Sequence, residues 1–480
     1  MEFSINIPSY SFSRKPFFKF LAIAMAIITI VTLGLFKFID ILPGEYFLVL
    51  CILLILFDLI FTSLIIVRKG VKRRAIGTVL SILYIIGLVL VIVYELNTIG
   101  FLKKLGFTDY KTENYSVLAL KESEYEKLTD LEDLSIGSLE FNTKGLKESK
   151  EKIEKNIDVD FITTDNITTL KNDFLEKEYE GMLIENSMLA MINESDANFQ
   201  EQYKVIYDFS IDVETENIAH EVDITKDAFN IFISGIDTYG SVSSVSRSDV
   251  NMIITVNPNT HKILITSIPR DYYVTLAGKN AKDKLTHAGI YGIETSVATL
   301  ENLLDIKINY YVKVNFTSLI DIVNALGGVN VYSKYSFTSQ DGYYYNAGYN
   351  NVDGKKALSF VRERKSFSEG DRTRVENQAA MIEALINKAI NPSIITKYTS
   401  LLNALDDSFI TNLDFDDITN FIKMQIADMP KWEVENISLD GKDGYDYTYS
   451  YGGTKLYVMI PDNETVINAS NRINTILKEK

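Results

Sequence analysis

Charged side chains of both signs stand at the ends of strand-like apolar segments. The chain reads NIFISGID up to Asp237, a serine-rich loop ending SRSD at Asp249, then VNMIITVNP, and ILITSIPRD up to Asp271. Buried strands that end in Asp237, Arg247, Asp249 and Arg270 need partners or a ligand for these charges. Carboxylates suit a hard cation and guanidinium groups suit phosphate oxygens, so the pattern fits a metal-bound polyphosphate. The alternative is a surface ion-pair network.

A second group of basic and amide side chains stands in the segment RERKSFSEGDRTRVENQ. Its candidate anion-binding residues are Arg362, Arg364, Arg374 and Gln378. Gly370 and Asp371 predict a turn that opens a helix from Arg372 to Ile390. Arg374 and Gln378 are four residues apart and share one helix face near the N-terminus, where anions bind well. Basic clusters are usually solvated, but in an acidic part of the chain this one favours a polyanionic ligand.

These side chains are predicted to sit on an α/β scaffold, because apolar strands alternate with helical segments after Arg270. We expect a helix over Thr286–Leu304, a strand at YYVKVN, a helix over Phe316–Leu326 and a further strand at VNVYS. One face of the first helix holds the small residues Ala288, Gly289, Gly292 and Ser296. They indicate either close helix–sheet packing or a groove for an apolar chain.

The segment from about Thr108 to Asp212 also alternates strands and helices, which predicts a small α/β or α+β module. The expected helices are Gly145–Asn156, Asn166–Glu178 and Asn186–Asp208. Ile211–Asp227 reads as a polar linker of which part adds a strand. The module contains no clustered metal ligands and no nucleophile, so the sequence assigns it no role.

Three long apolar segments lie near the N-terminus: Phe17–Phe36, Tyr46–Val67 and Ala75–Leu96. Each is close to the ~20 residues that cross a bilayer as a helix, so we predict three transmembrane spans. The first is not a cleavable signal peptide, because two more spans follow and no small-residue cleavage site separates them. The only cysteine, Cys51, excludes an intrachain disulfide.

The short loops around these spans carry unequal charge. Basic residues precede the first span and lie between the second and third: Arg14, Lys15, Lys19, Arg68, Lys69, Lys72, Arg73 and Arg74. The loop between the first two spans has only Lys37 against Asp40 and Glu45. The positive-inside rule then places the N-terminus in the cytoplasm and everything after Leu96 outside the cell.

The distribution of charge along the chain supports this division into a cytoplasmic and membrane part and an outer part. Residues 1–106 carry 11 Lys and Arg and 5 Asp and Glu, a net charge of +6, which leaves 37 basic and 59 acidic residues and a net charge of −22 for residues 107–480. Nucleic acid repels a domain of that charge unless it has a strong local basic patch. No helix-turn-helix, zinc or RNP-type motif is present either, so the sequence argues against a nucleic-acid partner.

Residues Phe229–Ile390 resemble the catalytic domain of the LytR-CpsA-Psr family of bacterial cell-envelope proteins. The shared motifs are GID, SRSD, VNP-x-T-x-K, SIPRD, K-L-x-H-A, VNF, GGV, and R-x-R followed by GD-x-x-R-x-x-x-Q. Three spans and a module ahead of that domain resemble the streptococcal capsule-locus CpsA-like branch of the family. The expected organisation is a membrane region over 1–106, an extracellular accessory domain and linker over 107–225, and an extracellular catalytic domain over 226–480.

The resemblance implies roles for the charged residues. Asp237 and Asp249 match the aspartates that bind Mg²⁺ in the family. The family's pyrophosphate-binding set corresponds to Arg247, Arg270, Arg362, Arg364, Arg374 and Gln378. A carboxylate near the metal could take the proton of the acceptor hydroxyl, with Asp237 the first choice and Asp371 the second. The expected catalytic set is therefore Asp237, Arg247, Asp249, Arg270 and Asp371.

The resemblance also implies an activity. Such proteins are phosphotransferases that move a glycopolymer, here a capsular or teichoic-acid-like polymer, from an undecaprenyl-pyrophosphate carrier to peptidoglycan at the outer face of a Gram-positive cell membrane. The implied partners are the lipid-linked polysaccharide, the peptidoglycan acceptor, the membrane and other capsule-assembly proteins. The alternative is a non-catalytic regulator or scaffold of capsule biosynthesis that binds the polyprenyl pyrophosphate without turning it over.

Overall fold

The computed structural model describes residues 15–67, 70–104, 110–140, 143–214, 218, 220–237, 242–243, 245–391 and 409–480. The chain forms two compact units, one of Met1–Lys104 with Ile418–Met429 and one of Leu105–Asp417 with Pro430–Lys480. The second unit contains both the predicted accessory segment and most of the predicted catalytic segment. Of the basic residues used to predict orientation, Arg14, Arg68 and Lys69 lie outside the described residues.

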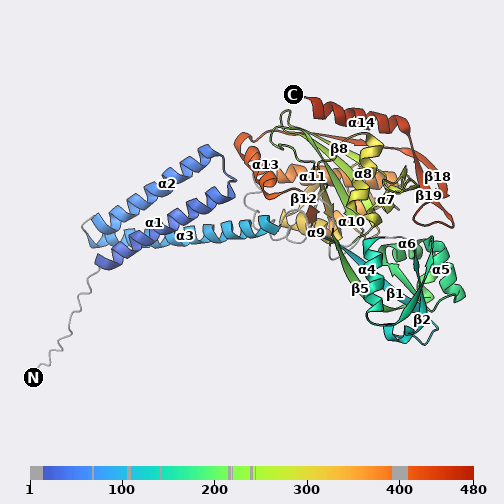
Figure 1. Cartoon of the computed structure of the whole chain (residues 1–480). Helices are drawn as coiled ribbons and strands as arrows, with labels where there is room; N and C mark the ends of the chain where they lie inside the picture. The colour runs from blue at the N-terminus through green and yellow to red at the C-terminus, as the bar shows by residue number, and fades with distance from the viewer. Residues whose placement is uncertain are drawn as a thin grey trace, which may run out of the picture. The chain divides into compact units, whose positions relative to one another are not determined.

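Long apolar helices make up most of the first unit (Figure 1). They are α1 (Lys15–Ile39), α2 (Gly44–Thr62), which continues into the π-helical turn η1 (Ser63–Val67), and α3 (Val71–Lys104). Stretches long and apolar enough to cross a membrane run over Pro16–Ile39, Gly44–Ile66 and Val71–Gly100. The three predicted apolar spans are thus confirmed. Many of their large apolar side chains are exposed, as lipid-facing side chains must be.

Most of a later helix, α13 (Phe415–Asp428), belongs to the same unit. Lys423 Nζ lies 2.7 Å from a carboxylate oxygen of Asp40, just after α1. Lys37 Nζ lies 2.9 Å from the other oxygen of Asp40. Two cations therefore share one carboxylate, and the Lys423–Asp40 pair attaches α13 to the end of α1.

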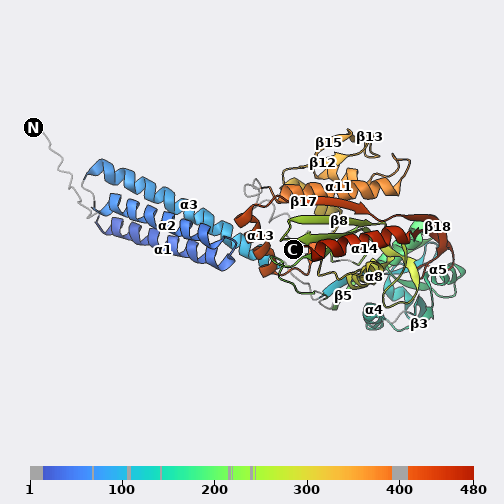
Figure 2. The same cartoon turned by 90° about the horizontal axis from the view of Figure 1, so that it is seen from above.

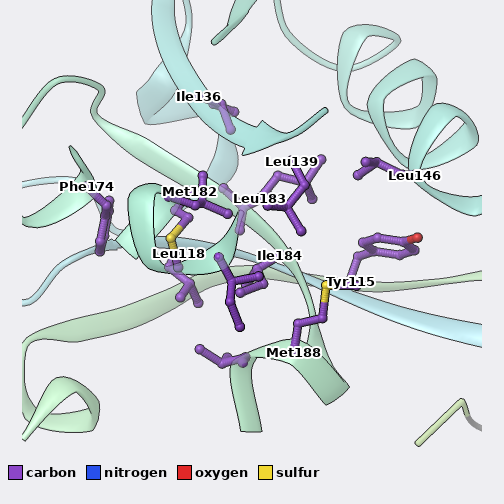
Figure 3. Close-up of a cluster of buried hydrophobic side chains, with 14 of the residues drawn as sticks. Tyr115, Leu118, Ile136, Leu139, Leu146, Phe174, Met182, Leu183, Ile184 and Met188 are labelled. Atoms are coloured by element: carbon purple, nitrogen blue, oxygen red, sulfur yellow. The ribbon is translucent and has the colours of Figure 1, made fainter. Parts of the chain in front are cut away.

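The accessory part of the second unit is a five-stranded mixed sheet in the order β3-β2-β4-β1-β5. Its strands are β1 (Tyr110–Leu120), β2 (Leu134–Leu139), β3 (Val159–Thr164), β4 (Gly181–Glu185) and β5 (Tyr203–Glu214). Its helices are α4 (Lys144–Glu154), α5 (Ile167–Glu176) and α6 (Asn186–Ser195). Figure 3 shows apolar side chains from the sheet and these helices meeting in one core, with Leu146 from α4, Phe174 from α5 and Met188 from α6.

The prediction of a helix over Asn186–Asp208 is wrong. Helix α6 ends at Ser195 and strand β5 begins at Tyr203, pairing antiparallel with β1 along its length. The segment YKVIYDFSIDVE is rich in aromatic and β-branched residues that suit a strand. Its buried residues alternate at Phe209, Ile211 and Val213. The strand runs to Glu214, so part of the predicted linker does add a strand.

The part predicted to be catalytic is built on a six-stranded mixed sheet in the order β16-β11-β6-β7-β8-β17. The strands are β6 (Phe229–Ile236), β7 (Ser248–Asn257), β8 (Lys262–Ile268), β11 (Tyr310–Val314), β16 (Phe409–Thr411) and β17 (Glu433–Ser438). β6, β7 and β8 are antiparallel neighbours, whereas β11 and β17 join them in parallel. The α/β class predicted from the sequence is confirmed.

Helices cover both faces of this sheet. On one face lie α7 (Leu285–Ala288), α8 (Ile293–Leu304) and α14 (Asn463–Lys478), and on the other α11 (Asp371–Ala389) with α9 (Phe316–Ala325) and α10 (Gly354–Arg362) beside it. Figure 2 shows α11 and α14 on opposite sides of β8 and β17. Phe232, Ile253 and Leu264 of the sheet pack with Leu300 of α8 and Ile473 of α14.

Four short antiparallel ribbons complete the second unit. The ribbons pair β9 (Tyr273–Thr275) with β10 (Lys282–Lys284), β12 (Val329–Ser333) with β15 (Gly348–Val352), β13 (Phe337–Thr338) with β14 (Tyr344–Tyr345), and β18 (Gly441–Tyr447) with β19 (Lys455–Pro461). The loop between β18 and β19 carries Tyr451 into the accessory core. The backbone oxygen of Tyr451 accepts a hydrogen bond from Thr168 Oγ1 at 2.7 Å, so the two parts of this unit are packed together.

The predicted helix Thr286–Leu304 is broken. After α7 the chain makes the 3₁₀ turn η4 (Gly289–Tyr291) and passes through Gly292, whose φ of +111° favours glycine, before α8. A Cβ on Gly289 would lie 2.6 Å from the backbone oxygen of Ser246. Ala288 and Ser296 are fully buried. The small residues therefore serve close packing, and the groove interpretation is wrong for Gly289.

Candidate active site

The ends of β6, β7 and β8 bring four predicted residues to one edge of the sheet. Ile236 at the end of β6 pairs with Ser248 at the start of β7, so Asp237 lies beside the segment that holds Arg247 and Asp249. β8 runs antiparallel to β7 and ends at Ile268 opposite Asn251. Arg270 follows two residues later at the same edge. The strand-end arrangement predicted from the sequence is confirmed.

Asp249 is buried and held as an anion. Arg270 Nη1 donates to Asp249 Oδ2 at 3.0 Å, and Thr286 Oγ1 donates to Oδ1 at 3.0 Å. Burial alone would raise the pKa of Asp249, but Arg270, Arg247 and Arg374 outweigh it and hold that pKa below its ordinary value. Asp249 therefore stays ionised at neutral pH.

Asp237 has the opposite electrostatic setting. Desolvation by the surrounding protein, followed by repulsion from Asp249, raises the pKa of Asp237 above its ordinary value, although Arg362, Arg247 and Arg270 oppose the shift. Its side chain stays exposed at the end of β6. Because the pKa values of these two carboxylates are shifted in opposite directions, Asp249 suits the role of a fixed anion and Asp237 that of a proton acceptor.

The second group of predicted residues comes from α10 and the start of α11. The Arg362 guanidinium lies over the Phe316 ring, 4.4 Å from its centre. Gln378 Nε2 donates to the backbone oxygen of Val361 at 3.3 Å, which links α11 to the end of α10. Arg374 is 8% exposed, and burial followed by repulsion from Arg270 lowers its pKa. Gly370 takes a φ of +53° at the turn that starts α11.

These two groups line one cavity of about 350 Å³, which we call the arginine cavity. Its polar lining includes all of the predicted phosphate-binding residues and both predicted metal ligands: Asp237, Arg247, Asp249, Arg270, Arg362, Arg364, Arg374 and Gln378. Its apolar lining comes from the sheet and from α9 and α11: Ile233, Ile236, Val250, Val314, Phe316, Leu319, Met381 and Ile382. A charged region and an apolar region thus share one cavity.

The ion-pair interpretation describes only some of the arginines. Arg270 pairs with Asp249, Arg247 pairs with Glu194, and Arg374 Nη2 lies 2.5 Å from Asp371 Oδ1. Arg362 and Arg364 make no ion pair with the described residues. Arg270 Nε and the Nε and Nη2 nitrogens of Arg374 are buried and make no hydrogen bond with the described residues, although Asp271 Oδ2 lies 3.5 Å from Arg270 Nε and Asp371 lies beside Arg374 Nη2. The cavity therefore holds more donor capacity than its own carboxylates use.

Asp371 is placed differently from the other predicted catalytic residues. It lies in the first turn of α11 and pairs with Arg374. It is not among the residues that line the arginine cavity. Asp271 is also engaged, because Lys284 Nζ lies 3.0 Å from its carboxylate. Of the two predicted proton acceptors, Asp237 and Asp371, Asp237 is therefore the better placed.

Sequence reasoning missed Glu194, which lines the arginine cavity from the accessory module. It comes from α6 and pairs with Arg247, with half of its side chain exposed. Burial would raise the pKa of Glu194, but Arg247 and Arg270 hold it below its ordinary value. Nothing in the segment INESD distinguishes this acid from a solvated one, so the signal lay only in the packing of the two parts.

The residues present fit the magnesium ion that the resemblance implies. No group of three or more His, Cys, Asp or Glu side chains suited to a metal occurs among the described residues. Asp237 and Asp249, however, both line the arginine cavity and repel each other. Mg²⁺ commonly takes one or two carboxylates and completes its shell with substrate phosphates and water. The donor set therefore suits an ion that binds together with a pyrophosphate.

Comparison with known proteins gives consistent matches. The LytR_cpsA_psr family model matches residues 193–465. TagU of Bacillus subtilis (strain 168), named a polyisoprenyl-teichoic acid–peptidoglycan teichoic acid transferase, is 39% identical over 200 residues, which cover 41% of this chain and 64% of TagU. The match therefore spans less than two thirds of that relative's length. TagU of Bacillus anthracis (strain CDC 684 / NRRL 3495) is 35% identical over 241 residues, 50% of this chain and 78% of the relative.

A match among solved structures is the crystal structure of B. subtilis TagU. It is 31% identical in sequence, with a TM-score of 0.42, and the match covers 53% of this chain and 99% of that chain.

Proposed function

This chain belongs to the LytR-CpsA-Psr family, and we propose that it is a phosphotransferase that moves a glycopolymer from a polyprenyl-pyrophosphate carrier to peptidoglycan. The reaction class follows the names of its TagU relatives. The single observation that carries the proposal is the arginine cavity, in which unpaired cationic donors and an apolar wall stand side by side. A prenyl pyrophosphate has a matching charged group and apolar chain.

The arginines have the chemistry to hold the diphosphate. Guanidinium groups bind phosphate oxygens in two-pronged contacts, and Arg362 and Arg364 line the cavity, are exposed, and have no carboxylate partner among the described residues. The buried nitrogens of Arg270 and Arg374 can complete this set. Charge that spreads over the phosphate oxygens during transfer is stabilised by such preorganised donors.

The transfer step needs a proton acceptor. The oxygen of the acceptor hydroxyl forms a bond to the phosphorus that carries the glycopolymer, and the bond from that phosphorus to the bridging oxygen breaks. Prenyl monophosphate leaves, and the hydroxyl proton passes to Asp237. The raised pKa of Asp237 makes it a stronger base than Asp249, whose pKa is lowered.

Asp249 acts as the fixed anion of the site. It orients Arg270 through the 3.0 Å contact and is itself oriented by Thr286. Asp237 and Asp249 would hold the Mg²⁺, which neutralises phosphate charge when bound.

The membrane spans fit a lipid-linked substrate. Three apolar helices would keep the site close to the bilayer that holds the carrier. We propose that the large second unit lies outside the cell, as the charges of the short loops predict. The polymer would then be a capsular or teichoic-acid-like chain, and other capsule-assembly proteins would act beside this one.

The test is transfer by the full chain in detergent, with labelled lipid-linked donor and purified peptidoglycan. We expect label on the peptidoglycan with wild type, and transfer slowed by about 10²–10⁴-fold with Asp237→Asn. Lys144→Ala, a charge change elsewhere in the second unit, should transfer normally. Tight binding of the donor by wild type without any transfer would contradict the proposal and support the regulator or scaffold.

A further inference from the structure

An unexpected set of exposed tyrosines lies on the lobe formed by β12 to β15. From residue 110 onward, the described tyrosines that are largely exposed are Tyr110, Tyr332, Tyr335, Tyr344, Tyr349, Tyr445 and Tyr447. Four of these seven fall between residues 332 and 349, in the tyrosine-rich segment that the proposed phosphate chemistry does not use. Exposed aromatic clusters of this kind commonly mark a binding surface.

Strand register puts two of these tyrosines side by side. In the β12–β15 ribbon Tyr332 pairs with Tyr349, and Asn330 pairs with Asn351. All four side chains are exposed, because residues two apart on a strand share one face. Tyr332 is 53% exposed and Tyr349 is 72% exposed. We call these four residues the Tyr/Asn face.

The Tyr/Asn face is held rigid from behind. Val329, Val331 and Val352 point to the opposite side of the ribbon and are buried in the core that includes Met381 of α11. The rings of Tyr332 and Tyr349 lie 5.4 Å apart at 72°, an edge-to-face contact that fixes both. Large side chains that are ordered before binding lose little conformational entropy when a ligand arrives.

The chemistry of the Tyr/Asn face is uncharged and amide-rich. Asn330 and Asn351 make no side-chain hydrogen bond within the described part of the chain, so their amides can donate to and accept from a ligand. Aromatic faces stack on the C–H faces of sugar rings, and amides pair with hydroxyl and acetamido groups. None of the four residues is charged, so the face itself offers no cation to pair with the phosphates of a polyanionic polymer.

We propose that the Tyr/Asn face binds an N-acetylhexosamine glycan strand of peptidoglycan, the acceptor in the proposed function. The inference rests on that function for the identity of the partner. The Tyr/Asn face differs from the arginine cavity in its residues and in its ligand, which is a neutral sugar chain and not a lipid diphosphate.

The same lobe reaches the arginine cavity. Gln340 and Asp341, in the turn between β13 and β14, line the cavity. The backbone nitrogen of Gln340 donates to Glu363 Oε2 at 2.7 Å, and Glu363 stands between Arg362 and Arg364. Ser366 Oγ donates to the backbone oxygen of Thr338 at 2.8 Å. A glycan on this lobe is therefore bound to the element that also forms part of the phosphate site.

The experiment titrates the full chain in detergent with chitohexaose, a soluble β-1,4-linked N-acetylglucosamine hexamer, and follows binding by calorimetry. We expect Tyr332→Ala/Tyr349→Ala to weaken binding by about tenfold or more, because truncated aromatic anchors dominate such losses. Tyr332→Phe/Tyr349→Phe should bind nearly as wild type, because the ring faces remain. Denaturant unfolding should be similar for all variants, since both side chains are exposed.

The matched control is Tyr445→Ala/Tyr447→Ala in the β18–β19 ribbon. Tyr445 and Tyr447 are 69% and 56% exposed, but their neighbours are charged, with Lys455 over the Tyr447 ring. This control should keep wild-type binding. Absence of binding by wild type, full binding by Tyr332→Ala/Tyr349→Ala, or an equal loss in the control would overturn the inference. The inference would also be overturned if Tyr332→Ala/Tyr349→Ala lost chitohexaose binding only because the variant changed from a dimer to a monomer. The Tyr/Asn face would then be an interface between copies of this chain.

Failure of this inference is separable from failure of the proposed function. Binding of a prenyl pyrophosphate is measured on the same variants. If Tyr332→Ala/Tyr349→Ala binds both ligands as wild type does, the glycan inference fails and the phosphate site stands. If chitohexaose binds at the Tyr/Asn face while wild type does not bind the prenyl pyrophosphate, the proposed function fails.

Discussion

Two cavities of similar size in the second unit are both lined by ionisable side chains, yet they differ in how those charges are partnered. The arginine cavity measures about 350 Å³, and a second cavity of about 390 Å³ lies where the accessory sheet meets the segment before α8. We call the latter the accessory cavity. Its charged and tyrosine lining is Lys111, Glu113, Tyr115, Lys144, Glu185, Glu214, Lys279, Tyr291 and Glu294.

Protein groups satisfy most of the charges in the accessory cavity. Glu113 accepts from the Tyr115 hydroxyl at 2.7 Å and lies 3.3 Å from Lys111 Nζ. Lys144 pairs with Glu214 at 2.9 Å, and Lys279 lies over the Tyr291 ring. One oxygen of Glu294 is the exception without a hydrogen bond among the described residues.

In the arginine cavity several cationic donors lack such partners. The comparison indicates that neighbouring protein groups neutralise most charges of the accessory cavity, whereas the arginine cavity has cationic donors left over that suit an anionic ligand. Size alone does not separate a structural cavity from a binding site. The distinguishing feature of a binding site is a set of donors of one charge that have no hydrogen-bond partner in the protein.

The largest expected effect concerns Asp237. Asp237→Asn should lower the transfer rate by about 10²–10⁴-fold, the contribution of a general base. The ionised form of Asp237 accepts the proton, so the wild-type rate should fall when the pH is low enough to protonate this carboxylate, whose pKa is raised by the surrounding protein and would be lowered by bound Mg²⁺. The readout is the initial rate of label transfer between pH 4 and 8. Glu113→Gln, in the accessory cavity, should keep the wild-type pH profile; a profile unchanged in Asp237→Asn would exclude the role.

The next effect is on stability and separates paired from unpaired arginines. Arg270→Ala leaves Asp249 buried without its partner, since these side chains are only 13% and 9% exposed, and should lower the free energy of unfolding by about 3–5 kcal/mol. Arg364→Ala removes no ion pair and should change it by less than about 0.5 kcal/mol. Denaturant unfolding followed by the fluorescence of Trp432, the single tryptophan, measures both. Equal losses for the two variants would argue that Arg364 is structural as well.

Glu185 of the accessory cavity should make the free energy of unfolding depend on pH. Burial raises the pKa of Glu185 from 4.5 to about 8, so the folded state holds a proton that the unfolded state releases between these values. Its contribution to the free energy of unfolding should therefore fall by about 1.4 kcal/mol per pH unit as pH rises from 4.5 to 8. Glu185→Gln should remove this slope without changing transfer. A slope that is the same in the variant and wild type would show that Glu185 titrates normally.

The smallest expected effect concerns Glu194, the one carboxylate that the accessory module contributes to the arginine cavity. It competes with phosphate for Arg247, so Glu194→Gln should tighten binding of a prenyl pyrophosphate. The gain should be about 0.2–1 kcal/mol, because Glu194 is half exposed and such pairs are weak. Calorimetry on the full chain measures it. Weaker binding by the variant would mean that Glu194 positions Arg247 and does not compete.

The local patterns of the sequence predicted much of this site. Apolar runs ending in Asp237 and Arg270, and the turn at Gly370, have strong short-range causes in strand pairing and glycine conformation. The side chains they carry do meet in one cavity. The three apolar spans were equally clear, because about 20 apolar residues in a row have few other structures open to them.

Contacts between distant segments could not be predicted. Glu194 reaches Arg247 because the accessory and later parts of this unit pack together, through contacts such as Tyr451 in the accessory core and Val245 with Thr112, and no local pattern encodes that packing. In the Asn186–Asp208 segment only the first half forms a helix, α6, whereas pairing with β1 makes the end of the segment part of a strand. The pairing of Tyr332 with Tyr349 likewise depends on a strand register set by tertiary structure.

The most direct measurement is calorimetric binding of a short-chain prenyl pyrophosphate to the full chain in detergent, comparing Arg364→Ala with Lys144→Ala. These variants remove one exposed cation from the arginine cavity and one from the accessory cavity. We predict that Arg364→Ala weakens binding by about 1.5–3 kcal/mol, the range for hydrogen bonds to charged groups, and that Lys144→Ala leaves it unchanged. Arg364→Lys should restore only part of the binding free energy that Arg364→Ala loses, because an ammonium group cannot make the two-pronged contact. Unchanged binding by Arg364→Ala, or the same loss in both alanine variants, would contradict the assignment of the arginine cavity as the pyrophosphate site.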